Sequence, residues 1–160
     1  MPLPLLGEET LGSATAQQMI RAAAKDDSLA AVIVHVDSPG GSALASDLIW
    51  REVQRTQDAH EKQPQRSPPI IVSMGDVAAS GGYYVAMGAR QIFASPTTIT
   101  GSIGVVSLHF DLSGLLAKLG ISTSTFQRGK NADITSLYHP YSDDQRARMD
   151  ASMRRIYDLF

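Results

Sequence analysis

Residues 30–41 read AAVIVHVDSPGG, an apolar, largely β-branched run that ends abruptly in a polar, glycine-rich turn. A continuous run of this kind is typical of a strand covered on both faces, as in a parallel sheet. Residues 70–82 repeat the arrangement, since IIVSMGDVAASGG again passes from a strand pattern into a turn with two glycines. We therefore predict two neighbouring parallel strands whose carboxyl ends carry the two turns, where α/β proteins gather ligands and catalytic groups.

Helical patterns separate the strand patterns along the rest of the chain. We expect helices over residues 15–26, after Ser42, over residues 83–88 and 112–119, and after Ser142, with further strands at residues 91–94, 103–107 and, as an edge strand, 122–127. Residues 60–69 are polar and contain prolines, which indicates a surface connector. Strands that alternate with helices predict βαβ units, and hence one α/β domain over residues 1–160 with mostly parallel strands.

Composition excludes several functional classes. The chain has 160 residues, 43% of them hydrophobic and 19% charged, which suits one globular domain with its own core. A net charge of -2 argues against nucleic acid as the main partner. The absence of cysteine excludes disulfides, thiolate catalysis and cysteine-ligated metals. We see no targeting segment. The helical pattern that runs to the last residue indicates a piece of a longer chain.

Ser80 is the candidate nucleophile. It lies in the stretch Ala78-Ala79-Ser80-Gly81-Gly82, between a strand end and a short helix. This nearly matches the G-x-S-x-G nucleophile elbow, in which small neighbours let a substrate carbonyl approach the hydroxyl. Backbone N–H groups at the helix start would stabilise a developing oxyanion. The competing interpretation is a serine that merely caps the helix.

The base that a serine nucleophile requires is less evident. His109 with Asp111 is conceivable in a triad, although side chains two apart on a strand point the same way without facing each other. Ten of the fourteen basic residues are arginines, which do not give up a proton at useful pH. Of the four lysines, only Lys130 lies in a loop at the end of a late strand pattern. No Walker A, H-E-x-x-H, EF-hand or G-x-G-x-x-G motif is present, so we predict no metal and no cofactor.

Four ordered motifs resemble the signal peptide peptidase SppA (protease IV) family, and the resemblance covers nearly the whole chain. The motifs are VDSPGGS at 36–42, VSMG at 72–75, AASGGYY at 78–84 and TGSIGV at 100–105. The resemblance implies a Clp-protease/crotonase-like α/β fold and a Ser-Lys serine endopeptidase that degrades signal peptides left after protein export. It implies Ser80 as nucleophile, Gly41 and Gly81 as oxyanion-hole donors, and Ser102 as the residue that orients the lysine amine.

One position departs from the family pattern. The base lysine of single-domain members immediately precedes an Asp-Ile pair, but Ala132 precedes Asp133-Ile134 here, and Lys130 lies two positions earlier. The chain thus resembles the carboxyl-terminal half of a long two-domain member, whose amino-terminal half supplies the lysine. The implied partners are hydrophobic signal peptides, that upstream domain and further copies in a homo-oligomer. The implied location is the bacterial inner membrane, with the catalytic domain facing the periplasm or the cell exterior.

Two other functions remain open at this point. An acyl-CoA hydratase or isomerase on the same fold would use acid/base carboxylates in place of the serine, and Asp76 is the only acid in the nucleophile loop. A degenerate half could instead serve only as a scaffold for oligomers.

Overall fold

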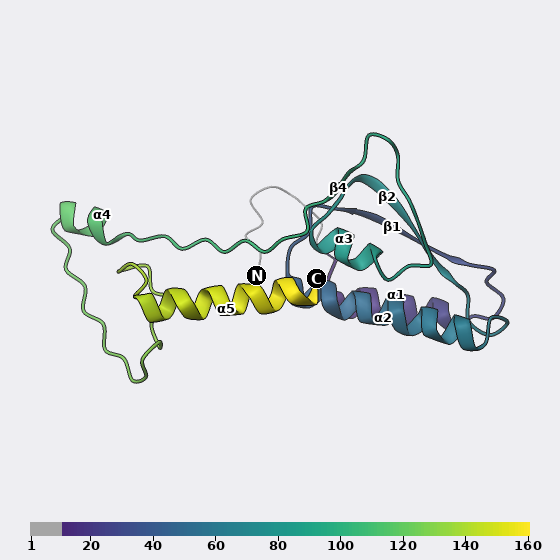
Figure 1. Cartoon of the computed structure of the whole chain (residues 1–160), viewed down its shortest axis with the longest axis horizontal. Coiled ribbons are helices and arrows are strands. Elements are labelled where there is room, and N and C mark those ends of the chain that lie inside the picture. The colour runs from purple at the N-terminus through teal and green to yellow at the C-terminus, as the bar shows by residue number, and fades with distance from the viewer. Residues whose placement is uncertain (1–10) are drawn as a thin grey trace. The chain divides into compact units, whose positions relative to one another are not determined.

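The computed structural model describes residues 11–160. It divides into two compact units, one ending at Ile103 and the other running from Gly104 to Phe160. The elements, labelled in Figure 1, are α1 (Ser13–Ala24), β1 (Val32–Ser38), α2 (Ala43–Lys62), β2 (Ile70–Ala79), α3 (Gly81–Ala86), β3 (Gln91–Phe93), β4 (Ile99–Gly101), α4 (Ser113–Lys118) and α5 (Asp143–Leu159).

The first unit is built around β2, the longest strand. β1 pairs with it along one edge, while β3 and β4 pair with its first and last parts respectively. All of these pairings are parallel. The alternation of strands and helices and the parallel sheet confirm the predicted α/β class. β2 also runs five residues past the predicted strand, directly to the residue before Ser80.

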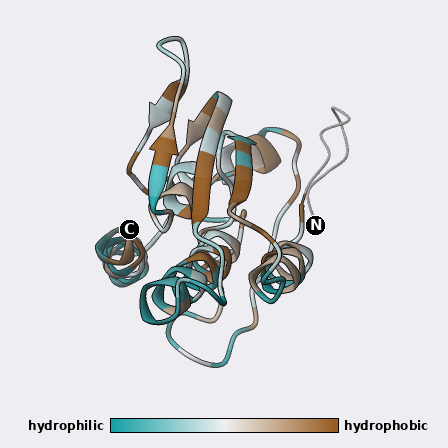
Figure 2. Ribbon diagram, turned by 90° about the vertical axis from the view of Figure 1, so that its right-hand side faces the viewer, coloured by the Kyte–Doolittle hydropathy of each residue, from teal (hydrophilic) through white to brown (hydrophobic). Residues whose placement is uncertain are grey.

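Helices cover one face of this sheet. α3 contacts β1 and β2, and α2 packs on α3, β2 and α1. Figure 2 shows the hydrophobic residues concentrated on the strands, and the core they form is centred on Val53, Ile70 and Val72, which are fully buried. Ile33, on the opposite face, is 70% exposed. The prediction from the apolar run that both faces of β1 are covered is therefore wrong for this structure. The cause is that the packed helices all lie on one face.

α2 is tied to its surroundings by polar side chains. Ser42 caps it by accepting from the N–H of Ala45, and the helix continues into the predicted connector as far as Lys62. The side-chain amide of Gln57 donates to the carbonyl of Ile70 at 3.0 Å and accepts from its N–H at 3.2 Å. The carbonyl of Ile70 also accepts from the N–H of Arg90 at 2.9 Å, so the main chain where β2 begins is bonded by both α2 and the residue before β3.

A buried carboxylate joins α1 to α2. Glu52 is only 3% exposed and forms ion pairs with Arg21, at 2.7 Å, and with Arg55. Burial raises the pKa of Glu52, but the hydrogen bonds and charges of the two arginines outweigh it, so the pKa is lowered overall. Removing one arginine would leave this buried carboxylate undercompensated, which makes the trio a structural requirement of the helix pair.

The second unit contains α4, α5 and irregular backbone. The predicted capping box at the start of α5 is confirmed, with Ser142 and Gln145 each accepting from the other's N–H. The strands predicted at residues 103–107 and 122–127 do not form, and β4 lies earlier, at Ile99–Gly101. An alternating pattern indicates a strand only if a partner strand exists, and residues 104–112 and 121–127 have none in the described structure.

Candidate active site

Ser80 lies at the sharp bend between β2 and α3. Its φ of 48° and ψ of -121° are rarely adopted by a residue with a side chain, and such strained backbone is concentrated at functional sites. The bend is held in place by β4, because the N–H of Ser80 donates to the carbonyl of Gly101 at 2.8 Å. Two residues before Ser80, the carbonyl of Ala78 accepts from the Thr100 hydroxyl of β4 at 2.8 Å. The strained geometry is therefore fixed from a neighbouring strand.

The hydroxyl of Ser80 does not cap α3. Ser80 occupies the N-cap position, but its side chain accepts no hydrogen bond from the first turn of the helix. By contrast, Ser42 and Ser142 both cap their helices through the hydroxyl. The capping interpretation of Ser80 is thus wrong for this structure, and its half-buried hydroxyl is left for other chemistry.

The turn after β1 reaches Ser80. Gly40 has a φ of 107°, and a Cβ added to it would lie 2.7 Å from the Cβ of Ser80 and 2.8 Å from the backbone nitrogen of Gly81. Only glycine permits both this conformation and this close approach. Sequence reasoning singled out Gly41 and missed Gly40, although two successive glycines after a strand were a signal for such an approach.

Gly41 and Gly81 lie next to each other. A Cβ built on Gly81 would lie 3.4 Å from the backbone nitrogen of Gly41 and 2.3 Å from the Oγ of Ser46. Within the described part of the chain, neither glycine's N–H donates a hydrogen bond to another group. The N–H of Gly81, which follows Ser80 in the chain, and the nearby N–H of Gly41 are therefore the candidates for oxyanion-hole donors.

Ser102 follows Gly101, the residue that accepts the N–H of Ser80. Its φ of 53° is again in the left-handed region, and its side chain is exposed. The first unit therefore brings together four of the five predicted site residues, namely Ser80, Gly41, Gly81 and Ser102.

Lys130, the fifth, belongs to the second unit. Its ammonium forms an ion pair with Asp144 in the first turn of α5, and its side chain is 75% exposed. A general base must be neutral, and burial rather than exposure favours a neutral amine. Lys130 therefore has a structural partner and lacks the environment that a base requires.

His109 and Asp111, the alternative base pair, form no hydrogen bond or ion pair with each other in the described structure. The imidazole of His109 stacks on Tyr141 with ring centroids 3.9 Å apart. The carboxylate of Asp111 accepts from the N–H of Ser113 at 2.9 Å, and hydrogen bonding by Ser113 lowers the pKa of Asp111. Each residue thus has other partners, although the segment that carries them is not a strand in this structure.

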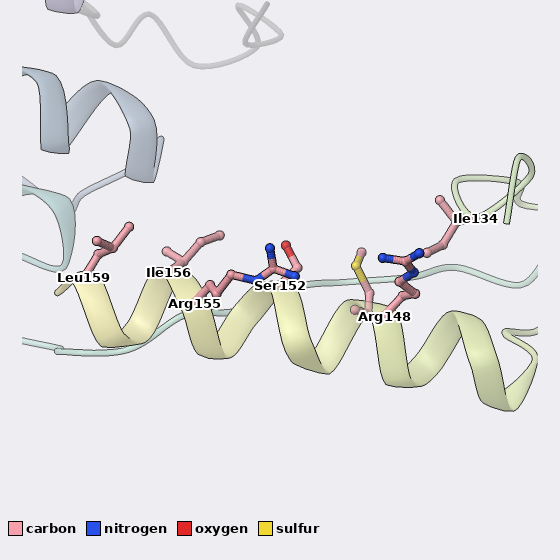
Figure 3. Close-up of a pocket in the computed structure, with 7 residues that line it drawn as sticks. Ile134, Arg148, Ser152, Arg155, Ile156 and Leu159 are labelled. Carbon is pink, nitrogen blue, oxygen red and sulfur yellow. The ribbon is translucent and has the colours of Figure 1, made fainter.

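Figure 3 shows a groove of about 380 Å³ along α5 in the second unit. The guanidinium groups of Arg148 and Arg155 and the hydroxyl of Ser152 lie among apolar side chains from Ile134, Met149, Ile156 and Leu159. Its lining contains no histidine, lysine or carboxylate, so it offers no base for Ser152. Elsewhere in residues 11–160, no group of three histidines or acids could hold a metal ion. No helix in that range combines the length and apolar character needed to cross a bilayer.

The family model and the three curated relatives described next are all peptidases or proteases by name. The model for peptidase family S49 matches residues 62–160, which include Ser80, Gly81 and Ser102. The chain is 42% identical over 144 residues to the chloroplastic serine protease SPPA of Arabidopsis thaliana, covering 89% of this chain and 20% of that protein. It is 34% identical over 155 residues to Protease 4 of Haemophilus influenzae, covering 95% of this chain and 24% of that protein.

A third relative comes from Enterococcus faecium and is named "Putative signal peptide peptidase SppA". It is 34% identical over 136 residues, which cover 85% of this chain and 38% of that protein. The chain thus spans between a fifth and two fifths of the length of these curated relatives.

Proposed function

Because the chain belongs to peptidase family S49, with an α/β fold consistent with the Clp-protease-like fold of that family, we propose that it is the nucleophile-bearing part of a serine endopeptidase. The observation that carries the proposal is the arrangement at the end of β2. There Ser80, whose hydroxyl does not cap α3, lies on a strained bend near Gly41 and Gly81, and the N–H groups of these glycines have no acceptor among residues 11–160. A nucleophile and an oxyanion site on one rigid sheet edge suit acyl transfer.

The proposed reaction begins when the Oγ of Ser80 attacks the carbonyl carbon of a peptide bond and loses its proton to an amine base. The N–H groups of Gly41 and Gly81 donate to the oxyanion that forms. The C–N bond then breaks, and the base returns the proton to the leaving amine. Water hydrolyses the acyl-serine by the same route, which regenerates the hydroxyl of Ser80.

The amine base in this proposal is a lysine from another domain or chain. Two features of the chain support an external donor. Ala132 occupies the position before Asp133-Ile134, and the ammonium of Lys130 is exposed and paired with Asp144. A lysine that becomes buried at a contact between domains would lose solvation, which favours its neutral form. Ser102, beside Ser80 through Gly101, would orient that amine.

We further propose that the substrates are hydrophobic signal peptides, bound extended through main-chain hydrogen bonds, in a homo-oligomer at the bacterial inner membrane with the site facing the periplasm or exterior. The name of the Enterococcus faecium relative supports the substrate class. An extended peptide suits a site at the end of parallel strands, since main-chain bonds give affinity without demanding one sequence.

The test is covalent labelling of the full-length protein that contains this chain. We expect a fluorophosphonate to label Ser80, and Ser80→Ala to abolish labelling and to lower the peptidase rate by at least ~10³-fold. Ser73→Ala is the matched control, because Ser73 is half-buried like Ser80 but lies within β2, seven residues earlier, and should keep both signals. Undiminished peptidase activity in Ser80→Ala would refute the proposal.

A further inference from the structure

The pairing of β1 with β2 is interrupted just before the candidate nucleophile. Val36 pairs with Met74, but the next pair is Ser38 with Ala78, so Asp37 alone lies opposite three residues, Gly75–Val77. The partner numbers differ by 38 before this bulge and by 40 after it. Without the shift, Ala78 would stand opposite Gly40. With it, Ser80 stands there, in agreement with the close approach of Gly40 to Ser80.

The side chain of Asp37 fills the inside of the bulge. Its Oδ1 accepts from the N–H of Val77 at 3.1 Å. The same side chain lies flat against Gly75, where an added Cβ would come within 2.8 Å of both the Cβ and the Cγ of Asp37. A bulge leaves main-chain groups without their ladder partners, and this carboxylate supplies one of them.

The opposite side of the bulge is held by the approach to β4. The hydroxyl of Thr98 donates to the carbonyl of Gly75 at 2.9 Å. The bulge is therefore bonded from both sides, through its N–H at Val77 and its carbonyl at Gly75. Ser80 follows Val77 by three residues, and Asp37 itself precedes the turn that carries Gly40 and Gly41.

We propose that Asp37 is a positioning residue for Ser80, holding the bulge whose two-residue shift places the nucleophile opposite Gly40 and next to the N–H of Gly41. The inference rests on the proposed function and deepens it. Asp37 acts on the reaction through the main chain of β2, and its partner in this task is Thr98. Bulges next to active sites commonly re-aim a side chain in this way.

The experiment compares four variants of the full-length protein. Asp37→Ala removes the acceptor of the Val77 N–H, whereas Asp37→Asn keeps an oxygen at the same place. Thr98→Val removes the bond to Gly75 from the other side. Asp76→Ala is the matched control, because Asp76 lies in the same bulge, is exposed, and its side chain makes no hydrogen bond or ion pair within the described residues.

Three quantities are measured for each variant: the rate of fluorophosphonate labelling, kcat and KM on a peptide substrate, and the hydrogen exchange of the amides of residues 77–81. We expect Asp37→Ala to lower the labelling rate and kcat by roughly 10–100-fold, as small misplacements of reacting groups do, with KM nearly unchanged. Thr98→Val should act in the same direction. Asp37→Asn should stay within about threefold of wild type, and Asp76→Ala should match wild type.

The proposal is overturned if Asp37→Ala labels as fast as wild type, or if Asp37→Asn or Asp76→Ala loses as much as Asp37→Ala. If Asp37→Ala does not fold, the proposal is tested by Thr98→Val and Asp37→Asn. A labelling rate in Thr98→Val equal to that of wild type then overturns it. If the wild-type protein is not labelled at Ser80, the proposed function fails. Amide exchange at residues 77–81 then still tests whether Asp37 holds the bulge.

Discussion

The main-chain N–H of Ser80 donates at 2.8 Å to the carbonyl of Gly101, the residue directly before Ser102, and Ser80 and Ser102 are the only two non-glycine residues of the described chain with positive φ. Ser80 has a φ of 48°, and Ser102, directly after Gly101, has a φ of 53°. Two strained backbone positions linked in this way cannot relax independently. The geometry of the nucleophile and that of the residue proposed to orient the base therefore form one structural unit.

Ser102→Ala and Ser102→Gly should both lower turnover while leaving the fold intact. Loss of one orienting hydrogen bond is worth about 1–3 kcal/mol, and neither variant can make it. Glycine adopts positive φ without steric cost, so Ser102→Gly should unfold at a urea concentration no lower than wild type. Ser107→Ala, at an exposed serine a few residues on, is the control for kcat. A kcat near wild type in both Ser102 variants would remove the role assigned to this hydroxyl.

The isolated 160-residue chain should show little peptidase activity, and Lys130→Ala should not change it. The reason is that a serine hydroxyl is a poor nucleophile without a base, and the amine of Lys130 is exposed and ion-paired. Mixing the chain with the upstream part of its parent protein should restore hydrolysis. The measurement is a peptidase assay on all three samples. Robust activity in the isolated chain that disappears in Lys130→Ala would make Lys130 the base.

Gly81→Ala should destabilise the protein through one identifiable contact. Its new Cβ would lie 2.3 Å from the Oγ of Ser46, which itself donates to the carbonyl of Ser42. Overpacking of this kind costs about 1–3 kcal/mol, measurable by urea unfolding. Ser46→Ala in the same protein should recover most of the loss. Gly114→Ala is the control, because nothing lies within 4 Å of a Cβ at that position. Equal losses in the single and double variants would point to a different clash.

The second unit should lose stability as the pH rises through the titration of His139. Its pKa is raised, chiefly by the backbone carbonyl of Pro140, which the ring contacts through Nδ1, and further by Asp133, 2.8 Å from Nε2, while burial opposes both. The Nε2 atom is 2.8 Å from a carboxylate oxygen, so a positive charge on the ring is stabilised by the charge of Asp133.

A raised pKa means that the folded state binds the proton more tightly than the unfolded state. The stabilisation is therefore complete below the unfolded value of about 6.5 and is lost as the pH rises through the folded value. Urea unfolding at a series of pH values should show this decline, and His139→Gln should flatten it. His35→Gln, in the first unit, is the control. A decline that persists in His139→Gln would assign it to another group.

The sequence predicted the strands and helices of the first unit well because their patterns are local. The apolar runs ending at Val36 and Met74 and the cap at Ser42 each depend on neighbouring residues only, as does the cap at Ser142 in the second unit. β4 was misplaced because pairing is a property of two segments. Residues 103–107 have the stronger strand pattern, but residues 99–101 are the ones that lie beside β2.

Most of the candidate active-site residues were also predictable from the sequence. Motif resemblance singled out Ser80, Gly41, Gly81 and Ser102, which the fold brings together. The role proposed for Asp37 had no signal in the sequence, since an acid after an apolar strand usually belongs to a turn. It becomes visible only when β1 and β2 are aligned and three residues are found opposite one.

The side-chain amide of Gln57 bonds both the N–H and the carbonyl of Ile70, so α2 determines which residue begins β2. Successive side chains of a strand point to opposite faces, so the placement of Ile70 determines which of the residues that follow it face the helices. Buried and half-buried residues alternate from Ile70 to Met74, but the alternation stops at the bulge, and Ala78 and Ala79 are both buried. A deletion or insertion of one residue between Ile70 and Met74 would therefore exchange the two faces of this part of β2, and the hydrogen bonds of Gln57 to Ile70 oppose such a shift.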